Sequence, residues 1–215
     1  MKFLAITLAR AGSKRIKNKN LLKISGSNLL EISYLNSIKS KFFKEIYLST
    51  ESKKIAMEGK KIGYNIPFMR PAYLSKDRSK SETAILNFLK RIKKKFKYII
   101  LLQPTSPLRT FYHIDSSIKK FLKENNDSLI SISCSVKKHK LSIGIKNNLL
   151  FKKEKKINGK YYFINGAIYI SKIDKFKKNR SFFSKKTGFY KMTEKYSLDI
   201  DTQRDLKILK NQKNK

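Results

Sequence analysis

The stretch YIILLQPTSPLR, residues 98–109, carries the strongest strand pattern in this 215-residue chain. An unbroken apolar run leads up to Gln103, which is typical of a strand buried on both faces of a parallel sheet. Pro104 then ends the run. With Pro107 it stiffens a polar loop at the carboxyl end of the strand, where a loop is well placed to hold a substrate. A turn that only ends the strand explains the same residues equally well.

The pattern around this strand is one of alternating strands and helices. Phe3–Leu8 is a second continuous apolar run. Further strands are predicted at 45–50, 66–69, 128–136 and 162–170, and helices around 29–38, 53–62, 81–96 and 114–122, with a last helix starting within 199–209. Strands separated by helices predict an α/β fold with a doubly wound, mostly parallel sheet. Ligands of such sheets bind beyond the carboxyl ends of the strands, where Arg10 and Gln103 are expected.

The alternation breaks after Lys137. Residues 137–161 are basic and contain short β-like pieces around Asn147-Asn148 and Asn158-Gly159, pairs that favour turns. We therefore expect a short inserted β-hairpin within a single domain that spans residues 1–215.

Composition limits the class of protein. Hydrophobic residues make up 40% of the chain and are evenly spread, as in a folded globular domain. Apolar runs are too short to cross a membrane, and the N-terminal residues lack the layout of a signal peptide. The single cysteine, Cys134, excludes an internal disulfide and fits a reducing compartment. We expect a cytoplasmic protein with no membrane partner.

The formal net charge of +36 raises the alternative of a nucleic-acid-binding protein. However, the lysines are scattered over the whole length and form no recognisable nucleic-acid-binding motif. The charge fits a general compositional bias better, so no specific nucleic-acid partner is expected. It would also help to attract a small anionic substrate.

The stretch ARAGSKRIKNKN, residues 9–20, leaves the first strand as a small-residue, basic loop. Backbone N–H groups of Ala11, Gly12 and Ser13 could converge on an anion there. The loop matches neither the Walker spacing nor G-x-G-x-x-G, so a solvated basic turn is the alternative. Of its cations, Arg10 and Lys19 are expected to matter, and the others are expected to be largely solvated: Lys14, Arg15 and Lys17.

The stretch DIDT, residues 199–202, places two aspartates at period-two spacing. In an extended segment Asp199 and Asp201 point the same way, and two neighbouring carboxylates suit Mg²⁺. Alternatively, Asp201 or Thr202 caps the last helix, with Asp205 completing an imperfect capping box. The metal interpretation is favoured because capping explains only one of the two aspartates.

Other chemically active side chains are weaker candidates. His113 and His139 lie far apart in the sequence and outside any zinc-ligand spacing. Cys134 lies within a predicted strand and has no obvious activating neighbour.

Together with MRPAYLSKD (69–77) and NGAIYI (165–170), these stretches resemble the acylneuraminate cytidylyltransferase family, which makes CMP-sialic acids and related CMP-activated sugar acids. The match runs from Phe3 to Leu209. The resemblance implies a Rossmann-like nucleotidyltransferase fold, and transfer of CMP from CTP to the anomeric 2-hydroxyl of a nine-carbon 2-keto sugar acid. Pyrophosphate leaves with help from Mg²⁺, and the products serve surface-glycan biosynthesis. Enzymes that activate 3-deoxy-manno-octulosonate share the fold and chemistry and are the alternative, although they lack this form of the LLQPTSPLR loop.

The resemblance also implies roles for individual residues. The acceptor sugar would be sialic, legionaminic or pseudaminic acid, and no side chain is an obvious general base. The implied roles are catalysis for Arg10, Lys19 and Asp201; nucleotide binding for Ala11, Gly12, Ser13, Asn20, Arg70 and Ser81, the last two at the cytosine; sugar binding for Gln103, Asn165 and Tyr169; and Mg²⁺ binding for Asp199 and Asp201.

Two departures from the family pattern stand out. Members often read F-R-P-N-G where this chain has YFING, so Phe163 and Ile164 replace an arginine and a proline, and a contact near the sugar is expected to be lost. The segment 137–161 is shorter than its counterpart in many relatives. In the family that region helps to form a homodimer and closes over the partner's sugar site. The resemblance therefore implies a homodimer through 137–161, although the segment is shorter here.

Overall fold

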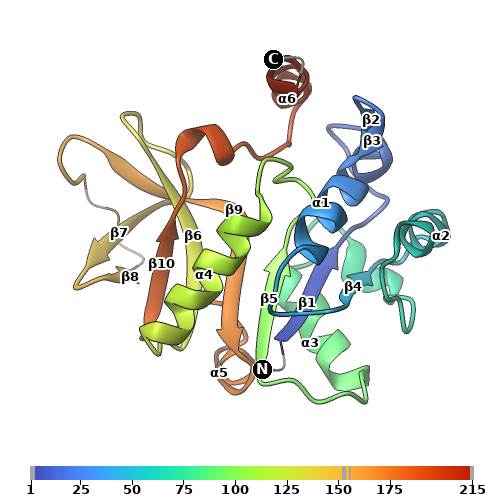
Figure 1. Ribbon diagram of the computed structural model, residues 1–215, viewed down its shortest axis with the longest axis horizontal. Coiled ribbons are helices and arrows are strands. Elements are labelled where there is room, and N and C mark those ends of the chain that lie inside the picture. The colour runs from blue at the N-terminus through green and yellow to red at the C-terminus, as the bar shows by residue number, and fades with distance from the viewer. Residues whose placement is uncertain (1–2, 152–153, 155, 214–215) are drawn as a thin grey trace.

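The computed structural model describes residues 3–151, 154 and 156–213, and its centre is an eight-stranded sheet with helices on both faces (Figure 1). Six strands follow one another across the sheet in the order β10-β6-β9-β5-β1-β4. Their bounds are β1 Phe3–Leu8, β4 Ile46–Ser49, β5 Tyr98–Leu102, β6 Ser128–Ser135, β9 Tyr161–Lys172 and β10 Thr187–Lys191.

Three of the five neighbouring pairs in this order are parallel: β1 with β4, β1 with β5, and β6 with β10. Strand β9 runs antiparallel between β5 and β6. The parallel register sets Ala5 opposite both Ile46 and Ile100, so the carboxyl ends of β4, β1 and β5 meet at one edge. The predicted α/β class with a mostly parallel sheet is confirmed.

The helices cover the sheet on two sides because β1 buries alternate residues on opposite faces. Phe3 and Ala5 pack into one hydrophobic cluster, and Leu4 and Ile6 pack into the other. The first cluster lies beneath α1 (Leu29–Ile38), α2 (Lys53–Ile62) and α4 (Phe111–Lys123). The second lies beneath α3 (Ser81–Arg91) and α5 (Ile173–Asn179). Figure 1 shows α1 and α4 on the side of the sheet that faces the viewer.

A third, smaller cluster joins the two ends of the chain. The last helix, α6 (Gln203–Lys213), packs Leu206 and Leu209 against Ile16 and Ile24 of the N-terminal segment. That segment contains the 3₁₀ helix η1 (Lys19–Leu21) and the short strands β2 (Lys23–Ile24) and β3 (Ser27–Asn28). Burial of these apolar side chains brings the segment around 199–202 next to the loop that follows β1. The remaining 3₁₀ helices are η2 (Ala72–Ser75) and η3 (Glu194–Tyr196).

The inserted hairpin is present. Strands β7 (Ser142–Lys146) and β8 (Leu149–Phe151) pair antiparallel, and β7 also pairs with β9. Asn147 and Asn148 form the turn with φ of 50° and 59°, the left-handed region that asparagine tolerates. Residues 152, 153 and 155 of the predicted 137–161 insertion lie outside the described residues.

Some predicted elements were wrong. Residues 66–69 form no strand: the pairing with β4 stops at the Asn65–Tyr47 bridge because Pro67 has no N–H to continue it, and Phe68 packs on Phe88 instead. Helix α3 ends at Arg91 rather than near residue 96. Strand β10 and helix α5 were not predicted. Within the described part of the chain, no helix combines the length and apolarity needed to cross a bilayer.

Candidate active site

The loop after β1 is fastened to the sheet by a buried ion pair. Arg70 Nη2 donates to Glu51 Oε2 at 2.9 Å and to the Ala9 carbonyl at 3.3 Å. The other oxygen of Glu51 accepts the Ala11 N–H at 2.8 Å. Glu51 is largely buried, but these hydrogen bonds hold the pKa of its carboxyl below its usual value. The pair therefore stabilises the start of the loop as a charged, hydrogen-bonded unit.

The same loop uses some of its backbone donors within the protein. The Ala11 N–H is used by Glu51, and the Ser13 N–H donates to the Ala11 carbonyl at 2.8 Å. Two of the three backbone donors expected to cradle an anion are thus bonded within the protein. In this structure the loop offers side-chain cations instead of a backbone cradle.

One group of these cations gathers around Asp77. Arg10 Nη1 lies 2.8 Å from Asp77 Oδ1, and Lys14 Nζ lies 2.6 Å from Asp77 Oδ2. The hydrogen bond from Lys14 and the neighbouring charges lower the pKa of the Asp77 carboxyl. Lys14 remains mostly exposed, as expected, and exposed pairs of this kind add little stability.

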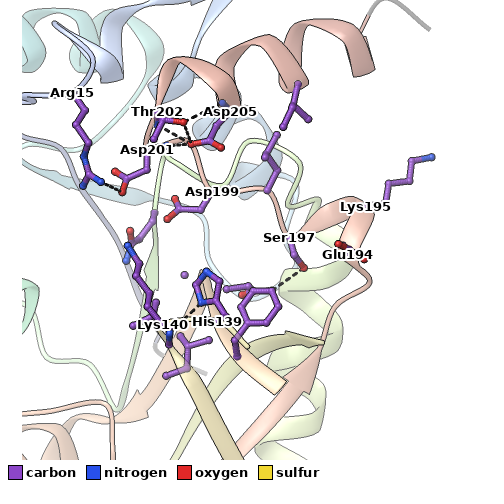
Figure 2. Close-up of a pocket in the computed structure, with 18 of the residues that line it drawn as sticks. Arg15, His139, Lys140, Glu194, Lys195, Ser197, Asp199, Asp201, Thr202 and Asp205 are labelled. Atoms are coloured by element: carbon purple, nitrogen blue, oxygen red, sulfur yellow. Dashed lines mark hydrogen bonds and ion pairs between the residues drawn. The ribbon is translucent and has the colours of Figure 1, made fainter. Parts of the chain in front are cut away.

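The other group gathers around Asp201. Lys19 Nζ lies 3.2 Å from Asp201 Oδ1 and donates to the Ile200 carbonyl at 2.9 Å. Arg15 Nη1 lies 2.8 Å from Asp201 Oδ2, a contact visible in Figure 2. Arg15 is exposed, but it faces the same carboxylate as Lys19, so sequence reasoning missed its place in the site. Lys17 is exposed, as expected.

The cap of α6 does not use either of the two aspartates of interest. Asp205 Oδ2 accepts the backbone N–H groups of Asp201 and Thr202, at 3.0 and 2.7 Å, and the Thr202 hydroxyl at 2.9 Å. Thr202 and Asp205 therefore form the capping interaction by themselves. Neither the Asp199 carboxylate nor the Asp201 carboxylate takes part in this cap.

Asp199 and Asp201 line one cavity of about 660 Å³, called here the main pocket. Gln103, Asn165 and Tyr169 line the same pocket. Burial raises the pKa of the Asp199 carboxyl, whereas a hydrogen bond from Thr105 and the charge of Lys19 oppose that rise. Figure 2 shows Asp199 and His139 among the side chains that line the main pocket.

His139 is a pocket residue that sequence reasoning set aside. Pairing of Ser142 with Phe163 brings the two strands together and stacks the His139 ring on Phe163, with centroids 4.5 Å apart. Its Nδ1 accepts the Leu141 N–H at 3.1 Å, so the neutral ring carries its proton on Nε2. Burial and Lys140 lower the pKa of His139, and Asp199 opposes this.

Two of the three residues assigned to the sugar, Asn165 and Tyr169, hydrogen-bond or pack within the protein. Asn165 is buried; its Oδ1 accepts from the Ser131 hydroxyl at 2.6 Å and from the Ala167 N–H at 3.2 Å, and its Nδ2 donates to the Ser197 hydroxyl at 3.1 Å. Burial raises the pKa of Tyr169, which packs against Phe182. Asn165 thus holds the wall of the pocket together.

Two smaller pockets adjoin the main one. The first, of about 250 Å³, is lined by Arg10, Lys19, Asn20, Arg70, Ser81 and Gln103, among others. The second, of about 340 Å³, is lined by Ser13, Lys14, Arg15 and Asp201, and again by Arg10, Lys19 and Asn20. The main pocket shares Gln103 with the first of these pockets and Asp201 with the second. Every residue to which the resemblance assigns a role lines one of these pockets, except Ala11 and Gly12.

Comparison with known proteins gives the family. The family model described as "Cytidylyltransferase" matches residues 4–214. The chain belongs to the cytidylyltransferase family. It is 32% identical over 212 residues to the CMP-N,N'-diacetyllegionaminic acid synthase of Campylobacter jejuni, covering 94% of this chain and 90% of that protein. It is 31% identical over 219 residues to an N-acylneuraminate cytidylyltransferase of Streptococcus agalactiae, of which it spans 52%.

The fold of this family member is also that of a solved enzyme of sugar-acid activation. A CMP:2-keto-3-deoxy-manno-octonic acid synthetase complexed with CTP superposes with a TM-score of 0.81 at 12% identity, covering all of this chain and 99% of the other. At this identity the likeness shows the fold alone. The expected resemblance to acylneuraminate cytidylyltransferases is confirmed by the sequence relatives.

The donor set of this cytidylyltransferase fits a magnesium ion that is bound partly by substrate. Asp199 and Asp201 offer carboxylate oxygens in one pocket, while no cluster of three or more His, Cys, Asp or Glu side chains suited to a metal occurs among residues 3–151, 154 and 156–213. Mg²⁺ in phosphate-transfer sites is commonly held by one or two carboxylates together with phosphate oxygens and water. Two carboxylates beside a cation-rich pocket match that pattern.

Proposed function

We propose that this protein transfers CMP from CTP to the anomeric 2-hydroxyl of a nine-carbon 2-keto sugar acid and releases pyrophosphate, in surface-glycan biosynthesis. The observation that carries the proposal is the junction of the pockets. The cation-rich pockets meet the main pocket at Gln103 and Asp201, so a phosphate chain on one side and an acceptor on the other can reach each other. Relatives named for legionaminic acid and N-acylneuraminate support the choice of acceptor.

On the nucleotide side, the cations of the loop bind the triphosphate. Arg10 and Lys19 line both small pockets, and their charges offset the negative charge that develops on the phosphoryl oxygens. In this structure Arg10 pairs with Asp77, and Lys19 pairs with Asp201. To bind the triphosphate, each cation leaves its carboxylate and contacts a phosphate oxygen instead. Fixed cations of this kind supply much of the catalysis in phosphoryl transfer.

The cytosine would lie in the pocket that contains Arg70 and Ser81. The Nη2 group of Arg70 is committed to Glu51 and Ala9, but its buried Nε has no hydrogen-bond partner within the described residues. A buried donor without a partner is costly, and a carbonyl oxygen of the base would satisfy it. Ser81 is exposed at the first turn of α3, on the wall of the same pocket.

On the acceptor side, the side chains of the main pocket orient the sugar acid. Gln103 lies at the junction and can hydrogen-bond the sugar acid, and Tyr169 forms part of the wall. Asp199 and Asp201 would hold Mg²⁺ together with substrate phosphates. The ion would supply charge stabilisation at the reacting phosphate. Asp201, which pairs with Lys19 and Arg15 in this structure, would exchange these partners for the ion.

We also propose a homodimer formed through the 137–161 insertion. Leu141 is 45% exposed and the adjoining Val136 is 69% exposed, so this part of the molecule presents apolar surface. Light scattering of purified protein measures the mass in solution, and twice the mass of the chain is the expected result. A monomer would refute this part of the proposal. The expectation of a cytoplasmic location rests, as before, on the lone Cys134.

The test of function is a screen for pyrophosphate release. CTP, UTP and ATP are each offered with Mg²⁺ and a panel of acids: N-acetylneuraminate, diacetyllegionaminate, pseudaminate and the eight-carbon 3-deoxy-manno-octulosonate. The proposal expects release with CTP and at least one nine-carbon acid. Equal rates with ATP or UTP would refute the cytosine pocket, and preference for the eight-carbon acid would refute the acceptor class.

A further inference from the structure

Arg109, the last residue of the stretch YIILLQPTSPLR, is a buried cation without a counter-charge. Its side chain is 1% exposed and is among the largest fully buried side chains of the described chain. No carboxylate of residues 3–151, 154 and 156–213 forms an ion pair with it. Arginine is seldom buried without such a partner, because desolvation of its charge is costly. Burial lowers its pKa to about 10, so the guanidinium is still charged at neutral pH.

The guanidinium instead donates hydrogen bonds to three protein oxygen atoms from three separate parts of the fold. Nη1 donates to the Gln103 carbonyl at 2.8 Å and to the Ala167 carbonyl at 3.0 Å, and Nη2 donates to the Ser33 hydroxyl at 2.8 Å. Gln103 follows β5, Ala167 lies within β9, and Ser33 lies in α1. The planar fork of arginine thus joins two neighbouring strands and the helix that covers them.

Each of the two strand contacts is one step away from the main pocket. The side chain of Gln103 lines the pocket where it meets the nucleotide side. The Ala167 N–H donates to Asn165 Oδ1, so Ala167 is one of the three groups, with Ser131 and Ser197, that orient the Asn165 amide. Arg109 therefore holds the backbone on either side of the acceptor.

A third link runs through the loop that Arg109 closes. The Arg109 N–H donates to the Ser106 carbonyl at 3.2 Å, and the Ser106 N–H donates to the Gln103 carbonyl at 3.4 Å. In the middle of this loop, the Thr105 carbonyl accepts the Ile200 N–H at 2.8 Å. Ile200 separates Asp199 from Asp201. The loop that Arg109 closes is therefore hydrogen-bonded to the segment that carries both carboxylates.

We propose that Arg109 is a positioning residue of the acceptor half of the site: its guanidinium fixes Gln103, the Asn165–Ala167 segment and, through Thr105, the Asp199–Asp201 segment relative to one another. This inference rests on the proposed function for the identity of the acceptor. Rates of group transfer fall steeply when reacting groups are misplaced by about 1 Å, which gives the fork its catalytic importance.

The loop after β1, which carries most of the nucleotide side, has attachments of its own. The loop after β1 is held by Arg70 and Glu51, and Asn20 Nδ2 donates to the Arg10 carbonyl at 3.1 Å. None of these contacts passes through Arg109. Loss of the fork should therefore harm use of the acceptor much more than binding of the nucleotide.

The test compares wild-type protein with two variants. Arg109→Lys keeps the positive charge but loses the planar fork. The milder Ser33→Ala removes one of the three oxygen atoms that accept hydrogen bonds from Arg109. Ser117→Ala is the matched control, because Ser117 is likewise a buried helical serine with a hydrogen-bonded hydroxyl, but its partner is the Ile114 carbonyl and not Arg109. Measurements are the KM of the acceptor, kcat, the Kd of CTP by calorimetry, and local hydrogen exchange by mass spectrometry.

For Arg109→Lys we expect the acceptor KM to rise and kcat to fall, by about tenfold or more in kcat/KM, with the Kd of CTP within about twofold of wild type. Ser33→Ala should show the same pattern more weakly, and Ser117→Ala should not. Hydrogen exchange should rise in peptides covering 103–109, 165–168 and 199–201, but not in β1.

A merely structural Arg109 would weaken both substrates alike or accelerate exchange throughout the chain, and either result overturns the proposal. So would an unchanged acceptor KM and kcat in folded Arg109→Lys. If that variant does not fold, Ser33→Ala decides by the same criteria. If wild-type protein transfers CMP to no sugar acid, the proposed function fails, and the local exchange pattern still tests the positioning role by itself.

Discussion

Lys19 Nζ lies 3.2 Å from Asp201 Oδ1, although the two residues are 182 positions apart in the chain. The contact exists because α6 packs Leu206 and Leu209 against Ile16 and Ile24, which closes the C-terminal segment over the loop after β1. It places a cation expected to bind phosphate beside a carboxylate expected to bind Mg²⁺. Four predictions follow from this arrangement and its surroundings.

Asp201→Asn should abolish pyrophosphate release while leaving the fold intact. The loss should be about 100-fold or more, because the variant loses a charged ligand at the reacting phosphate. Stability should change little, since the cap of α6 is formed by Thr202 and Asp205, and the backbone N–H of residue 201 still donates to Asp205. Steady-state kinetics and thermal melting measure the two effects. Near-normal turnover at saturating Mg²⁺ would contradict the assignment.

Lys19→Ala should raise the KM of CTP by about 10- to 100-fold, the range expected for a hydrogen bond to a charged group. Lys19 is only 14% exposed in its side chain and lies on the wall of both small pockets. Lys17→Ala is the matched control, because Lys17 is an exposed lysine of the same loop. Equal effects of the two substitutions would show that only the general positive charge matters.

Glu51→Ala should destabilise the protein by about 3 kcal/mol, because it leaves the buried Arg70 without its counter-charge and frees the Ala11 N–H. Lys120→Ala, which removes one partner of the exposed pair with Glu124 on α4, should change stability by less than about 0.5 kcal/mol. Urea denaturation measures both. Similar small losses would mean that the Glu51–Arg70 pair does not fasten the loop.

His113 should make the protein less stable in mild acid. Burial and the charge of Arg109 lower its pKa, and its Nδ1 accepts the Thr110 N–H in the cap of α4. A lowered folded-state pKa means that its stabilising effect is present above the ordinary pKa of histidine and is lost as pH falls through the folded-state value. The melting temperature should therefore drop between pH 7.5 and pH 5.5.

His113→Gln provides the comparison, because glutamine at this position of a capping box can still accept the same N–H without titrating. The drop in melting temperature should be smaller in this variant than in wild type. His139, whose pKa is also lowered, contributes to the remaining drop in both proteins. An identical drop in the two proteins would exclude His113 as a source of the pH dependence.

The central strands could be predicted from sequence because both faces of β1 and β5 are buried, which requires the continuous apolar runs at 3–8 and 98–102. Strand β10 could not, because TGFYK mixes polar and apolar residues and becomes a strand through pairing with β6. Local composition does not report such long-range pairing. The wrong strand at 66–69 has the opposite cause, since Pro67 outweighs its apolar neighbours.

The site shows the same limit. Asp199 and Asp201 could be proposed because their period-two spacing places two carboxylates on one side of an extended segment, and Gln103 because it ends the strongest strand pattern. Glu51 and Arg109 could not, since their roles depend on which distant groups they meet: a buried Arg70 for the first, and two strand carbonyls for the second. The contact between the Ala11 N–H and Glu51 was missed for a related reason. Ala11 could be seen in the sequence, but its partner Glu51 could not.

Transfer of CMP to the sugar acid is measured most directly by ³¹P NMR. The reaction contains the protein, CTP, Mg²⁺ and the nine-carbon acid that gives the fastest pyrophosphate release in the screen. We expect the three CTP resonances to be replaced by pyrophosphate and one phosphodiester resonance in equal molar amounts, and only when the acid is present. Pyrophosphate accompanied by free CMP, or formed equally well without the acid, would contradict this expectation.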